Sequence, residues 1–92
     1  MFIGLLQIEV RMDIHSLKEK RMIVKSFKER VRHKFNVAVS ETGFADKWQR
    51  AELSFVVVGN DKMVLEKNLN RILSLADENY KWSVNGFHID FY

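Results

Sequence analysis

The chain has no cysteine and no proline, and only four of its 92 residues are glycine. Without cysteine it can form no disulfide framework, no thiolate metal site and no cysteine nucleophile. No run approaches the ~18 apolar residues that a membrane-spanning helix needs, and no basic leader with an apolar stretch opens the sequence. We therefore expect a cytoplasmic protein with no membrane partner.

The length and composition favour one folded unit. A chain of this length buries only about 60 to 65% of its unfolded surface and cannot supply two cores. Its 47% apolar and 29% charged residues are typical of a globular protein rather than a disordered one. No linker, internal repeat or low-complexity tract is visible, so residues 1–92 are predicted to form a single domain.

Positive charge is concentrated in one segment. Between Ser16 and Phe35 stand eight Lys or Arg against two acids, a local net charge of +6 in a chain of +3, so the remainder carries −3. Five of these cations are spaced three and four apart and, at roughly 100° per helical residue, fall within a sector about 80° wide. We call them the basic stripe: Lys18, Arg21, Lys25, Lys28 and Arg32.

The basic stripe favours a polyanionic partner such as RNA. The alternative is that the cations only solvate the outer side of a helix. A solvated face usually mixes Glu and Lys at helical spacing, whereas here like charges are neighbours at a cost in stability.

Apolar periodicity predicts four strands and two helices. The strands are expected at residues 6–12, 35–40, 52–58 and 82–91. The helices are expected from Ser16 to about Phe35 and after Asp61. This β-α-β-β-α-β order, with two right-handed crossovers, predicts an α+β fold, the ferredoxin-like sandwich. In that fold a four-stranded antiparallel sheet has its first and third strands in the middle and both helices on one face.

Local signals support this assignment. Ser16 followed by Glu19 is the pattern of a helix N-cap, and Asp61 can cap the second helix in the same way. Residues 41–49 are expected to form a loop, and Gly86 a bulge in the last strand.

Three segments together carry a family resemblance: HSLKEKR at 15–21, FNVAVSE at 35–41 and WQRA at 48–51. They are similar to the YlxP-like family of small bacterial proteins, which is catalogued as a domain of unknown function. The resemblance covers almost the whole chain and implies a ferredoxin-like fold. It also implies a bacterial protein encoded beside translation genes, with a role in ribosome binding, and it brings no catalytic residues.

Two further places are candidate binding residues. His15 and Ser16, directly before the first helix, can present backbone N–H groups to a phosphate, because helix N-termini attract anions; alternatively Ser16 is only a cap. Lys47, Trp48 and Arg50 mix aromatic and cationic groups suited to stacking on bases or to contact with a protein. The alternative for Trp48 is that it folds back onto the core.

The open face of the predicted sheet does not suit RNA. Its outward residues on the central strands are expected to be Gln7, Glu9, Arg11, Glu52, Ser54 and Val56. These side chains cannot stack on bases as the aromatics of an RNA-recognition motif do, and the glutamates repel phosphate. RNA is therefore expected on the helix side, while the open face, with Val56, Val58, His88 and Tyr92 nearby, is a candidate homodimer contact.

No set of residues indicates a reaction. The three histidines lie in separate predicted elements, without the spacing of a metal site, and Ser40 and Ser54 have no neighbouring base. Acylphosphatases share the predicted fold, but their glycine-rich phosphate loop is replaced here by residues 12–15, which contain no glycine. We expect no enzyme activity, no metal and no cofactor.

The leading hypothesis is a non-enzymatic module that docks the basic stripe, with Lys47, Trp48 and Arg50, on RNA of the ribosome or a precursor. The main alternative is a protein-interaction or regulatory dimer that uses the sheet face and the loop containing Trp48. A third is a small-ligand sensor, since ferredoxin-like dimers can bind metabolites at their interfaces.

Overall fold

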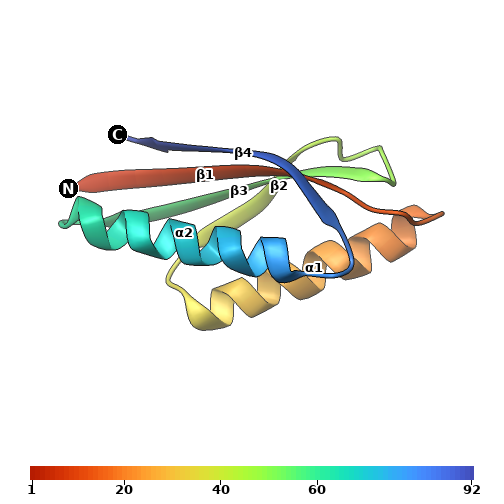
Figure 1. The fold of residues 1–92 in the computed structure, drawn as a ribbon, viewed down its shortest axis with the longest axis horizontal. Helices are drawn as coiled ribbons and strands as arrows, with labels where there is room; N and C mark the ends of the chain where they lie inside the picture. The colour runs from red at the N-terminus through yellow and green to blue at the C-terminus, as the bar shows by residue number, and fades with distance from the viewer.

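The computed structural model describes residues 1–92 and has two layers (Figure 1). A four-stranded antiparallel sheet forms one layer, and two helices cover one of its faces. The elements in chain order are β1 (Phe2–Arg11), α1 (Leu17–Lys34), β2 (Ala38–Gly43), β3 (Arg50–Gly59), α2 (Lys62–Glu78) and β4 (Ser83–Phe91). The predicted ferredoxin-like β-α-β-β-α-β sandwich is confirmed.

The strand order is β2-β3-β1-β4, so β1 and β3 are central, as predicted, and β2 is an edge strand. β1 pairs with β3 along its whole length, from Phe2 opposite Gly59 to Arg11 opposite Arg50. Because side chains alternate between the two faces of a strand, the buried residues Leu6, Ile8 and Val10 face the helices. Their neighbours in β1 lie on the open face.

The core fills the space between the sheet and the helices. In its centre the Phe27 ring of α1 packs edge to face against Phe55, with centroids 6.2 Å apart, and against Trp82, at 4.8 Å. Trp82 is buried just before β4, and its indole N–H donates a 2.8 Å hydrogen bond to the carbonyl of Ala76. The tryptophan of the core is therefore Trp82 and not Trp48.

Both predicted helix starts are confirmed. The Ser16 hydroxyl accepts a hydrogen bond from the N–H of Glu19 at 3.2 Å, and the Asp61 carboxylate accepts from the N–H groups of Met63 and Val64. These caps satisfy backbone donors that have no partner within the helix. Neither helix is long and apolar enough to cross a bilayer.

The second strand lies later than predicted, at Ala38–Gly43 rather than 35–40. The N–H of Phe35 still donates to the carbonyl of Val31 at 2.9 Å, so the helical hydrogen bonding of α1 continues to Phe35 and β2 begins after it. Pairing with β3 then continues to Gly43, past an irregularity after Glu41. The loop is consequently residues 44–49, shorter than the predicted 41–49.

Two other boundaries differ from prediction. β1 begins at Phe2 instead of residue 6, because the residues before Leu6 pair with the end of β3 and with β4. The predicted bulge at Gly86 is displaced by one residue: Gly86 pairs with Glu9 and Val84 with Val10, which leaves Asn85 as the extra residue.

Candidate nucleic-acid interface

The basic stripe lies along one flank of α1. The helix buries Lys20, Val24, Phe27 and Val31. Four members of the stripe each come directly after one of these buried residues. Successive residues of a helix are rotated by roughly 100°, so these four side chains point to the side of the helix and not into the core. All five are exposed except Lys28, which is half-buried. Arg32 donates to the Val39 carbonyl at 3.3 Å, so this flank borders the edge strand β2.

No cation of the basic stripe forms an ion pair. The ion pairs of the structure involve Lys20, Arg50 and His88 instead, and the two acids of α1, Glu19 and Glu29, pair with no cation. Within the stripe only Arg32 donates a side-chain hydrogen bond to the protein. The stripe is thus a row of like charges open to solvent, and a polyanion placed along it would relieve their repulsion.

Lys20 belongs to the +6 segment but not to its surface, because its side chain is 2% exposed. Its ammonium donates to the carbonyls of Phe44, at 2.6 Å, and Lys47, at 2.5 Å. It also lies 2.7 Å from the Glu41 carboxylate. All three partners belong to β2 or to the loop that follows it. Lys20 therefore ties this loop to the first turns of α1.

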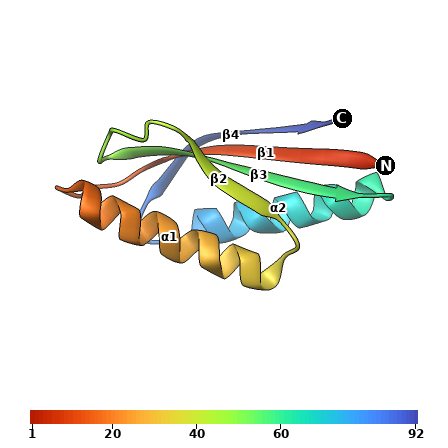
Figure 2. The same cartoon turned by 180° about the vertical axis from the view of Figure 1, so that it is seen from behind.

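Other contacts join the same loop to the segment between β1 and α1. The Gln49 carbonyl accepts from the N–H of Met12 at 2.9 Å, and the Gln49 side chain donates to the Ile14 carbonyl at 3.1 Å. Phe44 has a positive φ of 59°, which is uncommon for a residue other than glycine, and its carbonyl is held by Lys20 and by the Lys47 N–H. Figure 2 shows the β2–β3 connection and the start of α1 at the same end of the molecule.

The structure brings together two candidate regions that are distant in sequence. Trp48 lies against His15 in an edge-to-face arrangement, with ring centroids 6.2 Å apart and an interplanar angle of 72°. The indole remains 45% exposed, and Lys47 beside it is exposed too. Trp48 therefore neither enters the core nor stands free: it offers an aromatic surface next to the N-terminus of α1.

Ser16 and His15 have visible structural uses at this end. The Ser16 hydroxyl caps α1 and the His15 ring supports Trp48. Their role in anion binding stays a prediction. The three histidines lie apart, and no group of three or more His, Cys, Asp or Glu side chains is placed to hold a metal ion.

Arg50 does not join the other candidate residues. It begins β3 one position before the buried Ala51, so the strand alternation places it on the open face of the sheet. There its guanidinium pairs with the Glu9 carboxylate and lies 4.0 Å from the centroid of the Phe44 ring. Arg50 therefore lies on the opposite face of the sheet from the helices, and its charge is paired with Glu9. Its role in RNA binding stays a prediction.

The open face has a polar end and an apolar end. At the polar end Gln7 donates to Ser54 at 3.3 Å and Thr42 donates to the Glu52 carboxylate at 2.5 Å. No aromatic side chain of β1 or β3 faces away from the helices, as predicted. The apolar end comprises Ile3, Leu5, Val56, Val58 and Tyr92, of which Val58 and Tyr92 are the most exposed. Asp90 lies opposite Leu5 on the same face, at the β4 side of this end.

Comparison with known proteins shows that the chain matches a family of unknown function. A family profile described as "Protein of unknown function (DUF503)" matches residues 3–89. The "Uncharacterized protein YlxP" of Bacillus subtilis (strain 168) is 43% identical over 65 residues, which cover 71% of this chain and 71% of that protein.

Two solved structures resemble this chain, and the first of them supports the fold alone. The de novo designed protein Foldit4 has a TM-score of 0.55 at 16% identity and matches 99% of this chain and 94% of its own. A dimeric ferredoxin-like protein from an uncultured marine organism has a TM-score of 0.44 at 13% identity, over 98% of this chain and 92% of its own.

Proposed function

The chain belongs to the DUF503 family of proteins of unknown function, and we propose that it is a non-enzymatic RNA-binding module that acts in ribosome assembly or translation. In this proposal the basic stripe of α1 docks on RNA phosphates. The observation that carries it is the row of five cations without a single ion pair. The row spans the 15 helical residues from Lys18 to Arg32, or 14 rises of 1.5 Å, about 21 Å. This length is enough to follow several phosphates.

The loop at the start of α1 extends this surface. Trp48 is half exposed and Lys47 exposed beside the first turn of the helix. An aromatic side chain next to cations suits an unpaired base that stacks while its phosphate is neutralised. Lys and Arg contacts to phosphate position a nucleic acid without reading its sequence. The proposed ligand is therefore structured RNA with an unpaired base near the Trp48 end.

Co-sedimentation with ribosomal subunits and with free ribosomal RNA across a salt series tests the proposal. Five phosphate contacts give a slope of log K against log salt of about −3.5 to −4.5. A variant with Lys25, Lys28 and Arg32 replaced by Glu should lose association while its circular dichroism spectrum is unchanged. A second variant, with Lys18, Lys25 and Lys28 replaced by Glu, keeps the hydrogen bond from Arg32 to Val39 and should behave in the same way.

The matched control replaces three cations outside the stripe with Glu: Arg11, Lys62 and Lys81. All three are exposed, and this variant changes the net charge by the same amount as the stripe variants. It should retain association. Equal loss in the control and the stripe variants, or no association of the wild type at low salt, would overturn the proposal. Loss in Trp48→Ala with normal behaviour of the stripe variants would favour a protein partner instead.

A second candidate, self-association through the open face, is favoured by one observation. Ile3 lies opposite Val58 and Leu5 opposite Val56 in the register of the sheet, so the apolar residues at this end are contiguous. Contiguous exposed apolar surface commonly marks an interaction site. Sedimentation velocity tests this candidate: a dimer that dissociates in Val58→Lys supports it, and a wild-type monomer at high micromolar concentration rules it out.

A further inference from the structure

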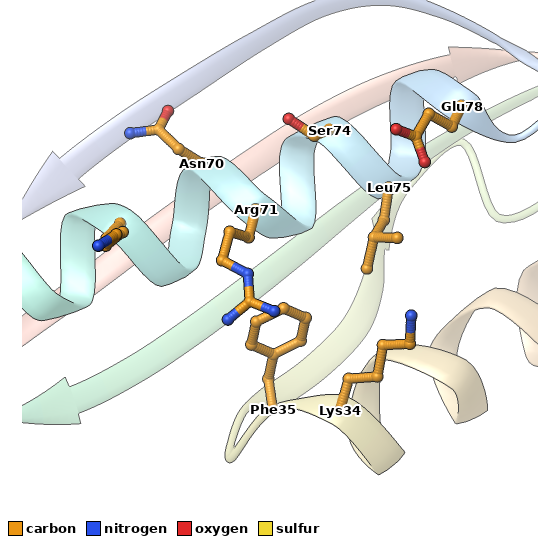
Figure 3. A pocket seen from close by; sticks show the side chains of 8 residues that line it. Lys34, Phe35, Asn70, Arg71, Ser74, Leu75 and Glu78 are labelled. Carbon is orange, nitrogen blue, oxygen red and sulfur yellow. The ribbon is translucent and has the colours of Figure 1, made fainter.

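A second cationic site lies between the two helices, on the other flank of α1 from the basic stripe. It is an open cavity of about 340 Å³ at the C-terminal end of α1 (Figure 3). Lys34, the last residue of α1, and Lys67 and Arg71, one turn apart on α2, line it. Arg32 of the stripe contacts β2 instead. The two sets of cations are therefore separate surfaces.

The cations of this cavity have no ion-pair or hydrogen-bond partner in the protein. None of Lys34, Lys67 and Arg71 forms an ion pair or donates a side-chain hydrogen bond, and Glu78, the one acid that lines the cavity, pairs with no cation. Lys67 and Arg71 are four residues apart on one helix, a spacing at which like charges destabilise. An anion bound between the helices would remove this repulsion.

Phe35 orients the arginine. The Arg71 guanidinium carbon lies 5.1 Å from the centroid of the Phe35 ring, and Figure 3 shows Arg71 reaching from α2 over this ring while Lys34 extends from α1 towards α2. This cation–π contact restrains the guanidinium group and leaves its N–H groups without a hydrogen-bond partner in the protein. A restrained guanidinium loses less side-chain entropy when it binds a phosphate through paired hydrogen bonds.

We propose that this cavity binds a small phosphorylated molecule of about mononucleotide size. Its phosphate lies between Lys34, Lys67 and Arg71, and its remaining part packs against the apolar side chains of Phe35 and Leu75, which also line the cavity. The volume falls in the range of small-molecule sites, about 300 to 1,000 Å³. The site is concave and faces away from the stripe, which favours a compact ligand over a strand of RNA.

Titration of the isotopically labelled protein, followed by NMR, tests the proposal with three probes: AMP, inorganic diphosphate and adenosine. AMP and diphosphate should cause saturable shifts of the backbone amides of Lys34, Phe35 and Arg71, and AMP should bind more tightly because of its apolar contact. Adenosine should cause none. Equal affinity for adenosine and AMP would contradict the phosphate site.

Two variants and one control separate the site from general charge attraction. Arg71→Gln and Lys67→Gln should each weaken AMP binding about tenfold or more, which is the loss expected for one charge-assisted contact. Lys67→Gln leaves the cation–π contact between Arg71 and Phe35 in place. Lys62→Gln changes a cation on the same helix but outside the cavity, and it should leave the affinity for AMP unchanged. Absence of saturable shifts, or shifts centred on the basic stripe, would overturn the proposal.

Discussion

Replacement of Lys20 by Met should loosen the β2–β3 loop and destabilise the whole fold. Methionine keeps a similar length but leaves the Glu41 carboxylate and the Lys47 carbonyl without this partner, while the Phe44 carbonyl keeps only the Lys47 N–H. Removal of one member of a buried ion pair costs about 3 to 5 kcal/mol. Glu41 is 23% exposed, and the carbonyls can reach water once the loop moves. We therefore expect a loss near the lower end, about 3 kcal/mol, or a fall of roughly 12 to 24 °C in Tm for a domain of this size.

Urea unfolding of Lys20→Met, Glu41→Gln and the double variant measures this loss and its origin. Because the side chains of Lys20 and Glu41 are in contact, the double variant should lose less stability than the sum of the losses in the two single variants. Lys25→Met is the control: it removes an exposed cation from the same helix and should change the free energy of unfolding by no more than about 0.5 kcal/mol.

Hydrogen exchange supplies a local measurement. The Lys47 N–H donates to the Phe44 carbonyl within the tethered loop, so its exchange should accelerate in Lys20→Met more than that of the central strands. A loss below about 1 kcal/mol, the value of an exposed ion pair, would refute the reasoning. So would full additivity in the double variant.

Three other substitutions test separate parts of the structure. Trp48→Ala should leave stability within about 0.5 kcal/mol, since the ring is half exposed, and should weaken RNA binding by about 1 to 3 kcal/mol in filter-binding assays. Ser16→Ala removes the hydroxyl that accepts from Glu19 and should cost ~1 kcal/mol in thermal unfolding. Gly4→Ala would place a Cβ 3.0 Å from the Phe91 ring and should cost about 1 to 3 kcal/mol by overpacking, also measured by unfolding.

The fold was predictable because its main elements carry strong local patterns. The alternation through Leu6, Ile8 and Val10 and the caps at Ser16 and Asp61 agree with the topology. β2 was harder to place, since its sequence contains Ser40, Thr42 and Gly43 and has little apolar alternation. Its bounds depend on pairing with β3, a contact between segments that no local pattern of β2 reveals.

The site was only partly predictable, for a similar reason. From the sequence, Lys20 counts only toward the net charge of the 16–35 segment, although its position continues the buried spacing of Val24, Phe27 and Val31. Its carbonyl partners lie 24 and 27 residues further along the chain, too far for a helix-based pattern to show. The face of Arg50, in contrast, could have been predicted, because it precedes the buried Ala51 in a strand.

The arrangement of charge gives the two parts of the proposed RNA interface different kinetic roles. The basic stripe is exposed, and the polar end of the open face, with Glu9 and Glu52, lies on the other side of the sheet. A cationic flank attracts a polyanion during its approach, an effect that weakens as the Debye length shrinks to about 8 Å at physiological salt. In the proposed interface Trp48 contributes only after contact, through stacking on a base.

Reversal of Lys25 and Lys28 should therefore lower mainly the association rate constant and reduce its salt dependence, as expected for charges that steer an encounter. Trp48→Ala should raise mainly the dissociation rate constant, because most contact losses at an interface appear there. Surface plasmon resonance with immobilised ribosomal RNA measures both constants. Equal effects of the two variants on the association rate constant would contradict the assignment of association to the stripe and of dissociation to Trp48.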